Sequence, residues 1–129
     1  MARLFNDAAS EWLSNATVVG GTVPFSVAMW FYTDDGTVPQ AMFSISNSGS
    51  ASDQFLLAFD GSNALAFGDN FVVCAARQGP DTAFASAYSG SAASVNAWQH
   101  IIGVWNSSTD RRGYLNGTRG TDNTTSKVP

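Results

Sequence analysis

The chain has 129 residues, a hydrophobic fraction of 44% and only 12% charged residues. This length fits one domain with an ordinary core, and the apolar content excludes a disordered chain. Six basic residues against ten acidic ones give a net charge of −4, which leaves too few cations for the basic patch of a nucleic-acid-binding protein. Ser, Thr and Asn together make up 35 residues, so we expect a polar but weakly charged surface.

Further classes of protein are disfavoured by the termini and the cysteine count. No apolar run approaches the roughly 20 residues of a membrane-spanning helix, so no membrane insertion is expected. No apolar segment follows Arg3 as it would in a signal peptide, so the sequence predicts a protein that does not use the general secretory route. Cys74 is the only cysteine, which excludes an internal disulfide and a cysteine-based zinc site, and its apolar neighbours predict a buried thiol.

Apolar and polar residues alternate with a period of two along the chain, which predicts strands. The first predicted strand lies within residues 24–34. One of its faces carries Phe25, Val27, Met29 and Phe31. The opposite face carries Ser26, Ala28, Trp30 and Tyr32.

Further strands follow at intervals typical of an all-β protein. They are predicted at Gln40–Ser46, Asp53–Asp60, Asn63–Phe67, Phe71–Arg77, Thr82–Tyr88, Trp98–Trp105 and Asp110–Asn116. The apolar run in Asp53–Asp60 indicates a strand that packs on both faces. Asn116-Gly117 is typical of a two-residue hairpin turn. No segment keeps the period of a helix, so we expect a single all-β domain over residues 1–129, either a sandwich or a barrel.

Several of these segments, in this order, resemble laminin G-like domains with the concanavalin A-like jelly-roll fold. Phe25–Phe31 is similar to the family's strand in which Phe-Thr precedes a tryptophan. Asn96–Trp105 is similar to the strand in which a tryptophan precedes two histidines, and Asp110–Gly117 to the hairpin that ends in Asn-Gly. The resemblance covers about residues 3–126, is of the bacteriophage and marine-bacterial type, and implies a two-sheet antiparallel jelly-roll sandwich.

The C-terminal end departs from the family pattern. Members usually continue past the Asn-Gly hairpin with strands that return to pair with the N-terminal strand, whereas this chain stops at Pro129. We therefore expect either a C-terminally truncated domain or an edge that another chain covers. An open edge favours self-association or binding to a neighbouring protein.

The resemblance also raises catalysis, because the superfamily includes glycosidases. Glycoside hydrolysis needs two carboxylates that flank one bond, and the hydrolase members carry a Glu-x-Asp-x-x-Glu pattern on one strand. The only glutamate here is Glu11, outside any such pattern, and Asp34 with Asp35 fit a turn. We therefore expect no catalytic residues and no enzymatic activity, and we keep a glycoside hydrolase or lyase as the alternative.

A histidine and several aspartates are candidates for other chemistry. His100 is the only histidine, and its position suits a general base or a ligand. It matches a position that is commonly structural in the family, so we expect a core or half-buried side chain bonded to the backbone. No cofactor is expected, with calcium as the open alternative, because some family members bind this ion at the rim through hard oxygen ligands. The aspartates near predicted loops are Asp34, Asp35, Asp53, Asp60 and Asp69.

Exposed aromatic side chains are the candidates for ligand binding. A sugar ring stacks on an aromatic face, while Asn, Asp and Gly bond its hydroxyl groups. The aromatic residues that we expect off the main core face are Trp12, Trp30, Tyr32 and Trp105. The opposing expectation is that Trp30 and Trp98 belong to the core, because a sandwich buries the inner faces of both sheets.

Together these observations predict a non-catalytic structural or adhesion module on the surface of a bacteriophage particle. It would act as a decoration, fibre or tail-associated protein and associate with itself or with other virion proteins. Repetition on a particle would give weak contacts to cell-surface glycans useful avidity. The remaining alternative is an adhesion domain of a larger secreted bacterial protein, with an extracellular location.

Overall fold

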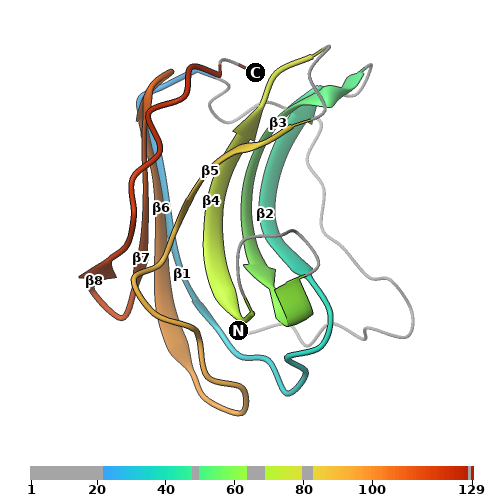
Figure 1. Cartoon of the computed structure of the whole chain (residues 1–129), viewed down its shortest axis with the longest axis vertical. Coiled ribbons are helices and arrows are strands. Elements are labelled where there is room, and N and C mark those ends of the chain that lie inside the picture. Colours follow the sequence, from blue (N-terminus) through green and yellow to red (C-terminus); the bar gives the residue numbers. More distant parts are fainter. Residues whose placement is uncertain (1–21, 48–49, 64–68, 80–82, 128) are drawn as a thin grey trace.

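The computed structural model describes residues 22–47, 50–63, 69–79, 83–127 and 129. They form two four-stranded sheets that face each other as the layers of a sandwich (Figure 1). Sheet A has the strand order β1-β6-β7-β8, and sheet B has the order β2-β3-β4-β5. Every neighbouring pair is antiparallel, so the predicted all-β antiparallel sandwich is confirmed.

Sheet A joins the first described strand to the last three. Its strands are β1 (Phe25–Phe31), β6 (Gln99–Ser107), β7 (Asp110–Leu115) and β8 (Thr118–Arg119). Sheet B consists of β2 (Gln40–Asn47), β3 (Ser50–Asp60), β4 (Phe71–Arg77) and β5 (Ala85–Tyr88), with a short 3-10 turn at Gly61–Asn63 after β3. The strand predicted at Thr82–Tyr88 begins only at Ala85. Of the strand predicted at Asn63–Phe67, Asn63 lies in the 3-10 turn, and the rest lies outside the described residues.

The core between the two sheets is centred on Trp105, which is 0% exposed. Its ring stacks on Phe25 at a centroid distance of 4.7 Å and meets Phe55 edge-on at 5.9 Å. Its Nε1–H donates a hydrogen bond of 3.0 Å to the carbonyl oxygen of Ala75 in sheet B. The indole therefore joins the two layers, because it fills the gap between them and also satisfies its one polar atom.

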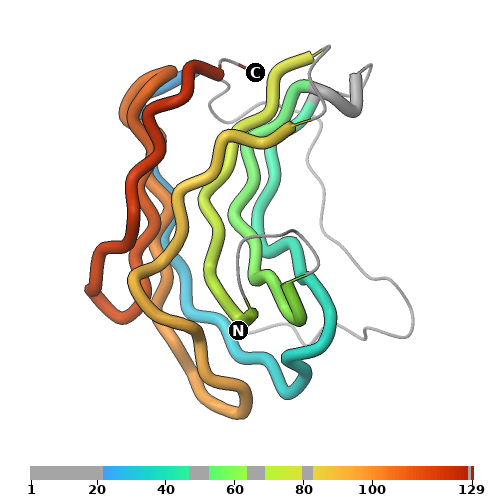
Figure 2. Tube along the Cα trace, viewed as in Figure 1, coloured from blue at the N-terminus to red at the C-terminus, as the bar shows by residue number. Residues whose placement is uncertain are grey.

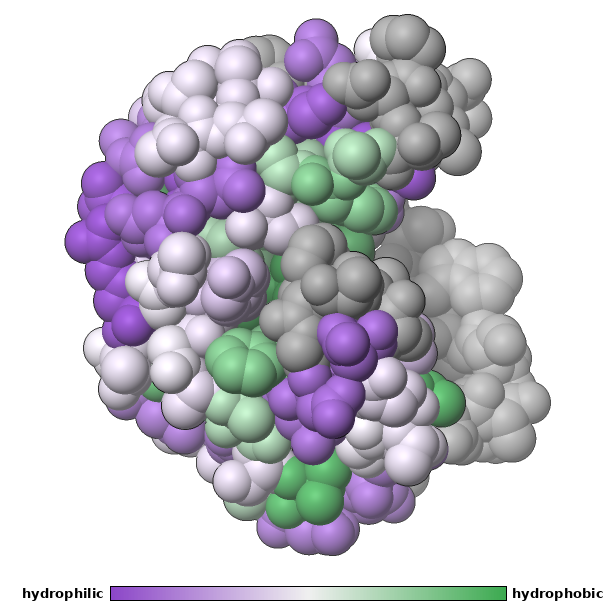
Figure 3. All heavy atoms as spheres, viewed as in Figure 1, coloured by the Kyte–Doolittle hydropathy of each residue, from purple (hydrophilic) through white to green (hydrophobic). Residues whose placement is uncertain are grey.

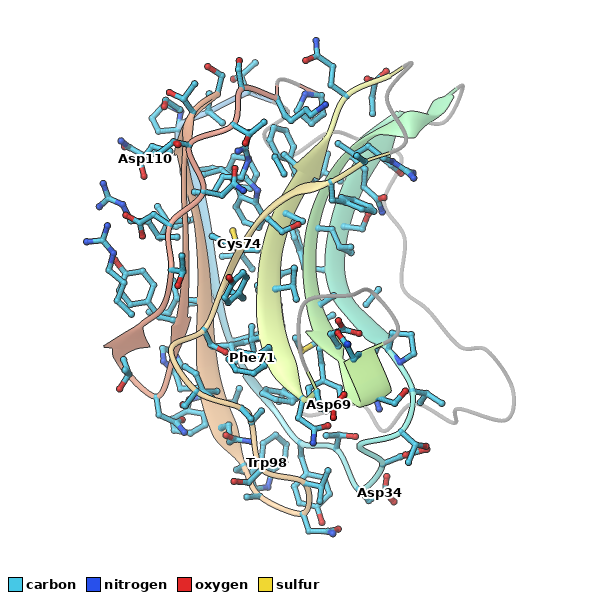
Figure 4. All side chains as sticks on the ribbon, viewed as in Figure 1. Asp34, Asp69, Phe71, Cys74, Trp98 and Asp110 are labelled. Carbon is cyan, nitrogen blue, oxygen red and sulfur yellow. The ribbon has the colours of Figure 1, made fainter. Side chains whose placement is uncertain are left out.

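Sheet B is buried on both faces in its centre, as the apolar run of β3 predicts. Leu57 and Phe59 pack into the core between the sheets, whereas Leu56 and Ala58 belong to a second buried cluster on the other face. Cys74 lies between the sheets (Figure 4) and is 0% exposed, which confirms the predicted buried thiol. Burial raises the pKa of this thiol to about 12.

After the Asn116-Gly117 turn the chain returns alongside β7 (Figure 2). The turn has positive φ at both residues, 48° and 82°, as the Asn-Gly hairpin predicts. Beyond β8, Arg111 and Asn123 exchange two backbone hydrogen bonds of 3.3 Å each. Thr121 also forms an isolated antiparallel bridge with Tyr88 of β5, so the segment after β8 contacts both sheets. The prediction of a C-terminally truncated domain stays a prediction.

The side chain of Arg111 holds this C-terminal segment in place. It is 0% exposed and donates hydrogen bonds to three main-chain carbonyls, those of Ser108 (2.6 Å), Thr125 (2.7 Å) and Lys127 (3.0 Å). A fourth bond, of 3.3 Å, goes to Oδ1 of Asn123. A buried cation is costly unless it is hydrogen-bonded, and here two carbonyls of the C-terminal segment and the Ser108 carbonyl of the β6–β7 turn supply partners.

Candidate functional site

The outward face of sheet A presents a group of aromatic side chains at the β1–β6 pair. Trp30 pairs with His100, and Phe31 pairs with Gln99 in the antiparallel register. Tyr32 and Trp98 are the next residues of each chain segment, and their rings contact each other just beyond the paired ends. We call Trp30, Tyr32, Trp98 and His100 the aromatic platform.

The four rings of the aromatic platform touch in two pairs. The Trp30 and His100 rings lie 5.2 Å apart between centroids, and the Tyr32 and Trp98 rings lie 5.6 Å apart. Trp30 is 65% exposed, Trp98 64% and Tyr32 47%. Such large apolar side chains are usually buried, so a contiguous exposed group of them points to a binding surface.

Hydrogen bonds beneath the platform fix the loop that carries Trp98. Asn96 has a φ of 60°, and its backbone N–H donates to the carbonyl of Thr33 at 2.7 Å. The Oδ1 atom of Asn96 accepts a hydrogen bond of 3.3 Å from the Tyr32 hydroxyl. The Gln99 side chain donates to the carbonyl of Ser94 at 2.7 Å. The Tyr32–Trp98 side of the platform is therefore held by hydrogen bonds to the loop at residues 94–96, which lowers the entropic cost of ordering these rings on a ligand.

The residues predicted to bind a ligand do not all lie on the surface. Trp30 and Tyr32 lie off the core face, as expected, whereas the opposing expectation that Trp30 and Trp98 belong to the core is wrong. The expectation for Trp105 is also wrong, because its indole fills the core and has no exposed surface. Trp98 and Trp105 are an odd number of residues apart in one strand run, so they point to opposite faces. Trp12 lies outside the described residues.

His100 is half-buried, but it lies on the outward face rather than in the core. Its backbone N–H donates a hydrogen bond of 2.9 Å to Oδ1 of Asn116, and its carbonyl accepts one of 2.8 Å from the Asn116 N–H. The hairpin at Asn116 therefore supports the histidine end of the platform. The alternation in the sequence placed His100 on the face of Trp98, but only the sheet pairing brought Trp30 to it.

The outward face continues from the platform along β6 and β7. The next cross-strand row joins Ala28, Ile102 and Tyr114. The row after that ends at Arg112, which forms two hydrogen bonds with Asp110, of 2.9 Å and 2.7 Å. These bonds hold the pKa of the Asp110 carboxyl below its ordinary value. Hydrophilic residues gather on the side of the molecule where β7 and β8 lie (Figure 3), while Trp98 lies at the opposite end of the molecule from Asp110 (Figure 4).

The aspartates considered for calcium do not converge in the described part of the chain. The backbone N–H and the hydroxyl of Thr37 each donate a 2.6 Å hydrogen bond to Oδ1 of Asp35, and these bonds lower the pKa of the Asp35 carboxyl. Asp53 accepts a 2.9 Å hydrogen bond from the Gly79 N–H. No group of three or more His, Cys, Asp or Glu side chains that could hold a metal ion occurs among the described residues, whereas calcium prefers six to eight oxygen ligands.

The chain was compared with models of known protein families. The laminin G family model described as the concanavalin A-like lectin/glucanases superfamily matches residues 6–129. The chain belongs to this superfamily. No curated protein and no solved structure matched the chain significantly. Membership of the concanavalin A-like superfamily confirms the jelly-roll sandwich that the sequence resembles.

Within this concanavalin A-like sandwich, the described residues offer the aromatic platform as their most distinctive surface. Trp98 and His100 were not among the predicted binding residues, although the alternation in Trp98–Trp105 placed them on one face. These two residues could have been identified only from the pairing of β1 with β6, which brings the aromatic ends of the two segments together. None of the described helical segments has the length and apolar character needed to cross a membrane.

Proposed function

We propose that this concanavalin A-like domain is a non-catalytic adhesion module that binds a glycan through the aromatic platform. The observation that supports this is the pair of tryptophans, Trp30 and Trp98, each with about two-thirds of its surface exposed. The C–H faces of a sugar ring pack on indole faces, and this contact releases water from both surfaces. A rigid sandwich that holds the rings in advance makes this contact at low entropic cost.

The acidic residues support binding without bond cleavage. The sequence has one glutamate, Glu11, and lacks the spaced acids of the glycosidase pattern. Along the chain after β1, the first carboxylate is that of Asp34, two residues beyond Tyr32. A single acid cannot act as both proton donor and nucleophile or base, which glycoside hydrolysis requires. The proposal therefore assigns recognition, and no chemical step, to this surface.

We place the module on the surface of a bacteriophage particle, as a decoration, fibre or tail-associated protein. The support is the resemblance to laminin G-like domains of the phage type and the weakly charged surface rich in Ser, Thr and Asn. Its partners there are further copies of itself or other virion proteins. Many copies on one particle convert a weak glycan contact into stable attachment to a host cell.

Binding is tested with a panel of immobilised bacterial and algal polysaccharides. The wild-type chain should bind at least one of them, and the double variant Trp30→Ala with Trp98→Ala should lose that binding while keeping its Tm. Val38→Ala is the matched control, because Val38 is also an exposed apolar residue, at 46% exposure, but lies outside the platform. Binding that survives in the double variant refutes the proposed site.

Two further measurements test the rest of the proposal. Incubation with the bound polysaccharide should release no reducing ends and no unsaturated products, and release of either would favour the hydrolase or lyase alternative. Mass spectrometry of purified phage particles should detect the chain among the virion proteins. Detection only as part of a larger secreted bacterial polypeptide would favour the alternative of an adhesion domain.

A further inference from the structure

The aromatic platform is longer than one sugar ring. The Trp30–His100 pair lies near the paired ends of β1 and β6, and the Tyr32–Trp98 pair lies two residues further along each chain segment, so the two ring pairs are roughly 7 Å apart along the strand direction. Trp30 and Trp98 are diagonal neighbours in this array, since the partner of Trp30 is His100. Diagonal residues of an antiparallel pair are about 7–8 Å apart. The two tryptophans are therefore separate stacking surfaces on one continuous platform, rather than two walls of a single pocket.

Polar groups border the platform where hydroxyl groups of a bound sugar would lie. Asn96 is exposed and uses its Oδ1 for the Tyr32 hydroxyl, so its Nδ2 group remains to donate to a ligand oxygen. Asn116 is also exposed, but its Oδ1 accepts from the His100 N–H and its Nδ2 donates to Oε1 of Gln99 at 3.4 Å, so it supports the platform rather than a ligand. The Asn96 amide exchanges hydrogen bonds with hydroxyl groups without requiring a charge on the ligand.

The charges around the platform disfavour an anionic ligand. Of the cations on the outward face of β7 and β8, Arg112 is bound to Asp110 and Arg119 to Asp122. Asp34 is exposed at the same end of the molecule as Trp98 (Figure 4). A carboxylate or sulfate group would therefore meet a negative charge at one end of the platform and neutralised cations at the other, on a chain of net charge −4.

We infer, building on the proposed function, that the ligand is a neutral linear oligosaccharide that occupies two stacking subsites. One subsite is the Trp30–His100 pair, and the other is the Tyr32–Trp98 pair, which Asn96 positions. The sugar chain crosses from one pair to the other over the outward surface of β1 and β6. Neutral sugars are selected because stacking and amide hydrogen bonds need no charge, whereas an acidic sugar would meet Asp34, and the arginines on this face of β7 and β8 are already paired with carboxylates.

Isothermal titration calorimetry on the intact chain tests this inference. The probes are neutral β-linked glucan and galactan oligomers of one to six units, with oligogalacturonate and sulfated galactan oligomers of the same lengths. Affinity for a neutral series should rise steeply from one unit to two or three and then level off. It should change less than twofold between about 0.05 and about 0.5 M NaCl, because no ion pair forms.

Single variants separate the two subsites. Trp30→Ala and Trp98→Ala should each weaken binding of a neutral trimer about tenfold, the loss expected for one stacking contact. Each should also reduce the dependence on chain length, since only one subsite remains. Asn96→Ala should weaken binding less than either tryptophan variant, and Val38→Ala should have no effect.

The possible results distinguish failure of this inference from failure of the proposed function. Salt-sensitive binding of the acidic oligomers that requires Trp30 and Trp98 would overturn the neutral ligand but keep the platform as a glycan site. Equal affinity for a monomer and a trimer would overturn the two subsites in the same way. Glycan binding that is insensitive to both tryptophan substitutions would overturn the inference and the proposed site together.

Discussion

Replacing Arg111 by Met should release the C-terminal segment from sheet A. The substitution keeps an unbranched aliphatic side chain in the buried position but removes four hydrogen bonds, three of which end on main-chain carbonyls. At about 1 kcal/mol net for each bond, the loss amounts to about 4 kcal/mol. Water rehydrates the freed carbonyls once the segment moves away, so we expect a loss of about 3 kcal/mol in the free energy of unfolding.

Arg112→Met is the matched control for this experiment. Arg112 is the next residue of the same strand, but it points outward and pairs with Asp110. Exposed ion pairs contribute little to stability, so this variant should unfold at nearly the same urea concentration as the wild type. The comparison therefore separates burial and carbonyl binding from positive charge alone.

Two measurements check the effect of Arg111→Met. Urea denaturation gives the free energy of unfolding for both variants. Hydrogen exchange then follows the Asn123 and Lys127 amides, which donate to the carbonyls of Arg111 and Ser108. We expect these two amides to exchange faster in Arg111→Met and to be unchanged in Arg112→Met. Equal stability of the two variants, with unchanged exchange in both, would refute the view that Arg111 fastens this segment.

Three further predictions concern the core and the close approach of the two sheets. Burial raises the pKa of the Cys74 thiol from 9.0 to about 12 in the folded state. Above pH 9 the unfolded chain therefore loses the thiol proton while the folded chain keeps it, and the free energy of unfolding falls by up to about 1.4 kcal/mol per pH unit. Urea denaturation of Cys74→Ala from pH 7 to pH 10.5 should show a smaller alkaline decline than the wild type, and an equal decline would contradict this cause. Trp105→Phe leaves the Ala75 carbonyl without its donor and should cost about 2 kcal/mol in urea denaturation; a change within experimental error would show that this bond contributes nothing. Gly120→Ala places a Cβ against the carbonyl oxygen of Tyr88 and should lower stability by about 3 kcal/mol, whereas an unchanged Tm would mean that the segment after β8 moves away freely.

The sequence alone determined the local features of this protein. Alternation in Phe25–Phe31 separated the two faces of β1, and the Asn116-Gly117 pair defined the hairpin between β7 and β8. The apolar run of β3 predicted a strand buried on both sides. These features depend on neighbouring residues of one segment, because side-chain alternation and turn conformation are set by local geometry. The family resemblance added the arrangement of these strands in a two-sheet antiparallel jelly-roll sandwich.

Only the tertiary structure decided which face of sheet A became the core. Alternation shows that Trp98 and Trp105 lie on opposite faces, but it does not show which of them meets sheet B. In the structure, Trp105 donates its hydrogen bond to Ala75 of sheet B, so the face that carries Trp105 is the inner face of sheet A. Likewise, the two arginines of β7 look alike in sequence, and burial of Arg111 depends on carbonyls that the returning C-terminal segment supplies.

The candidate site depends on the same non-local pairing. Trp30 and Tyr32 were recognisable as outward aromatic residues of one strand. The platform exists because β1 pairs with β6 in a register that sets Trp30 opposite His100 and brings Tyr32 within hydrogen-bonding distance of Asn96, 64 residues away. Register between distant strands is fixed by the burial of their inward faces against the second sheet, so no local pattern could have placed these four rings together.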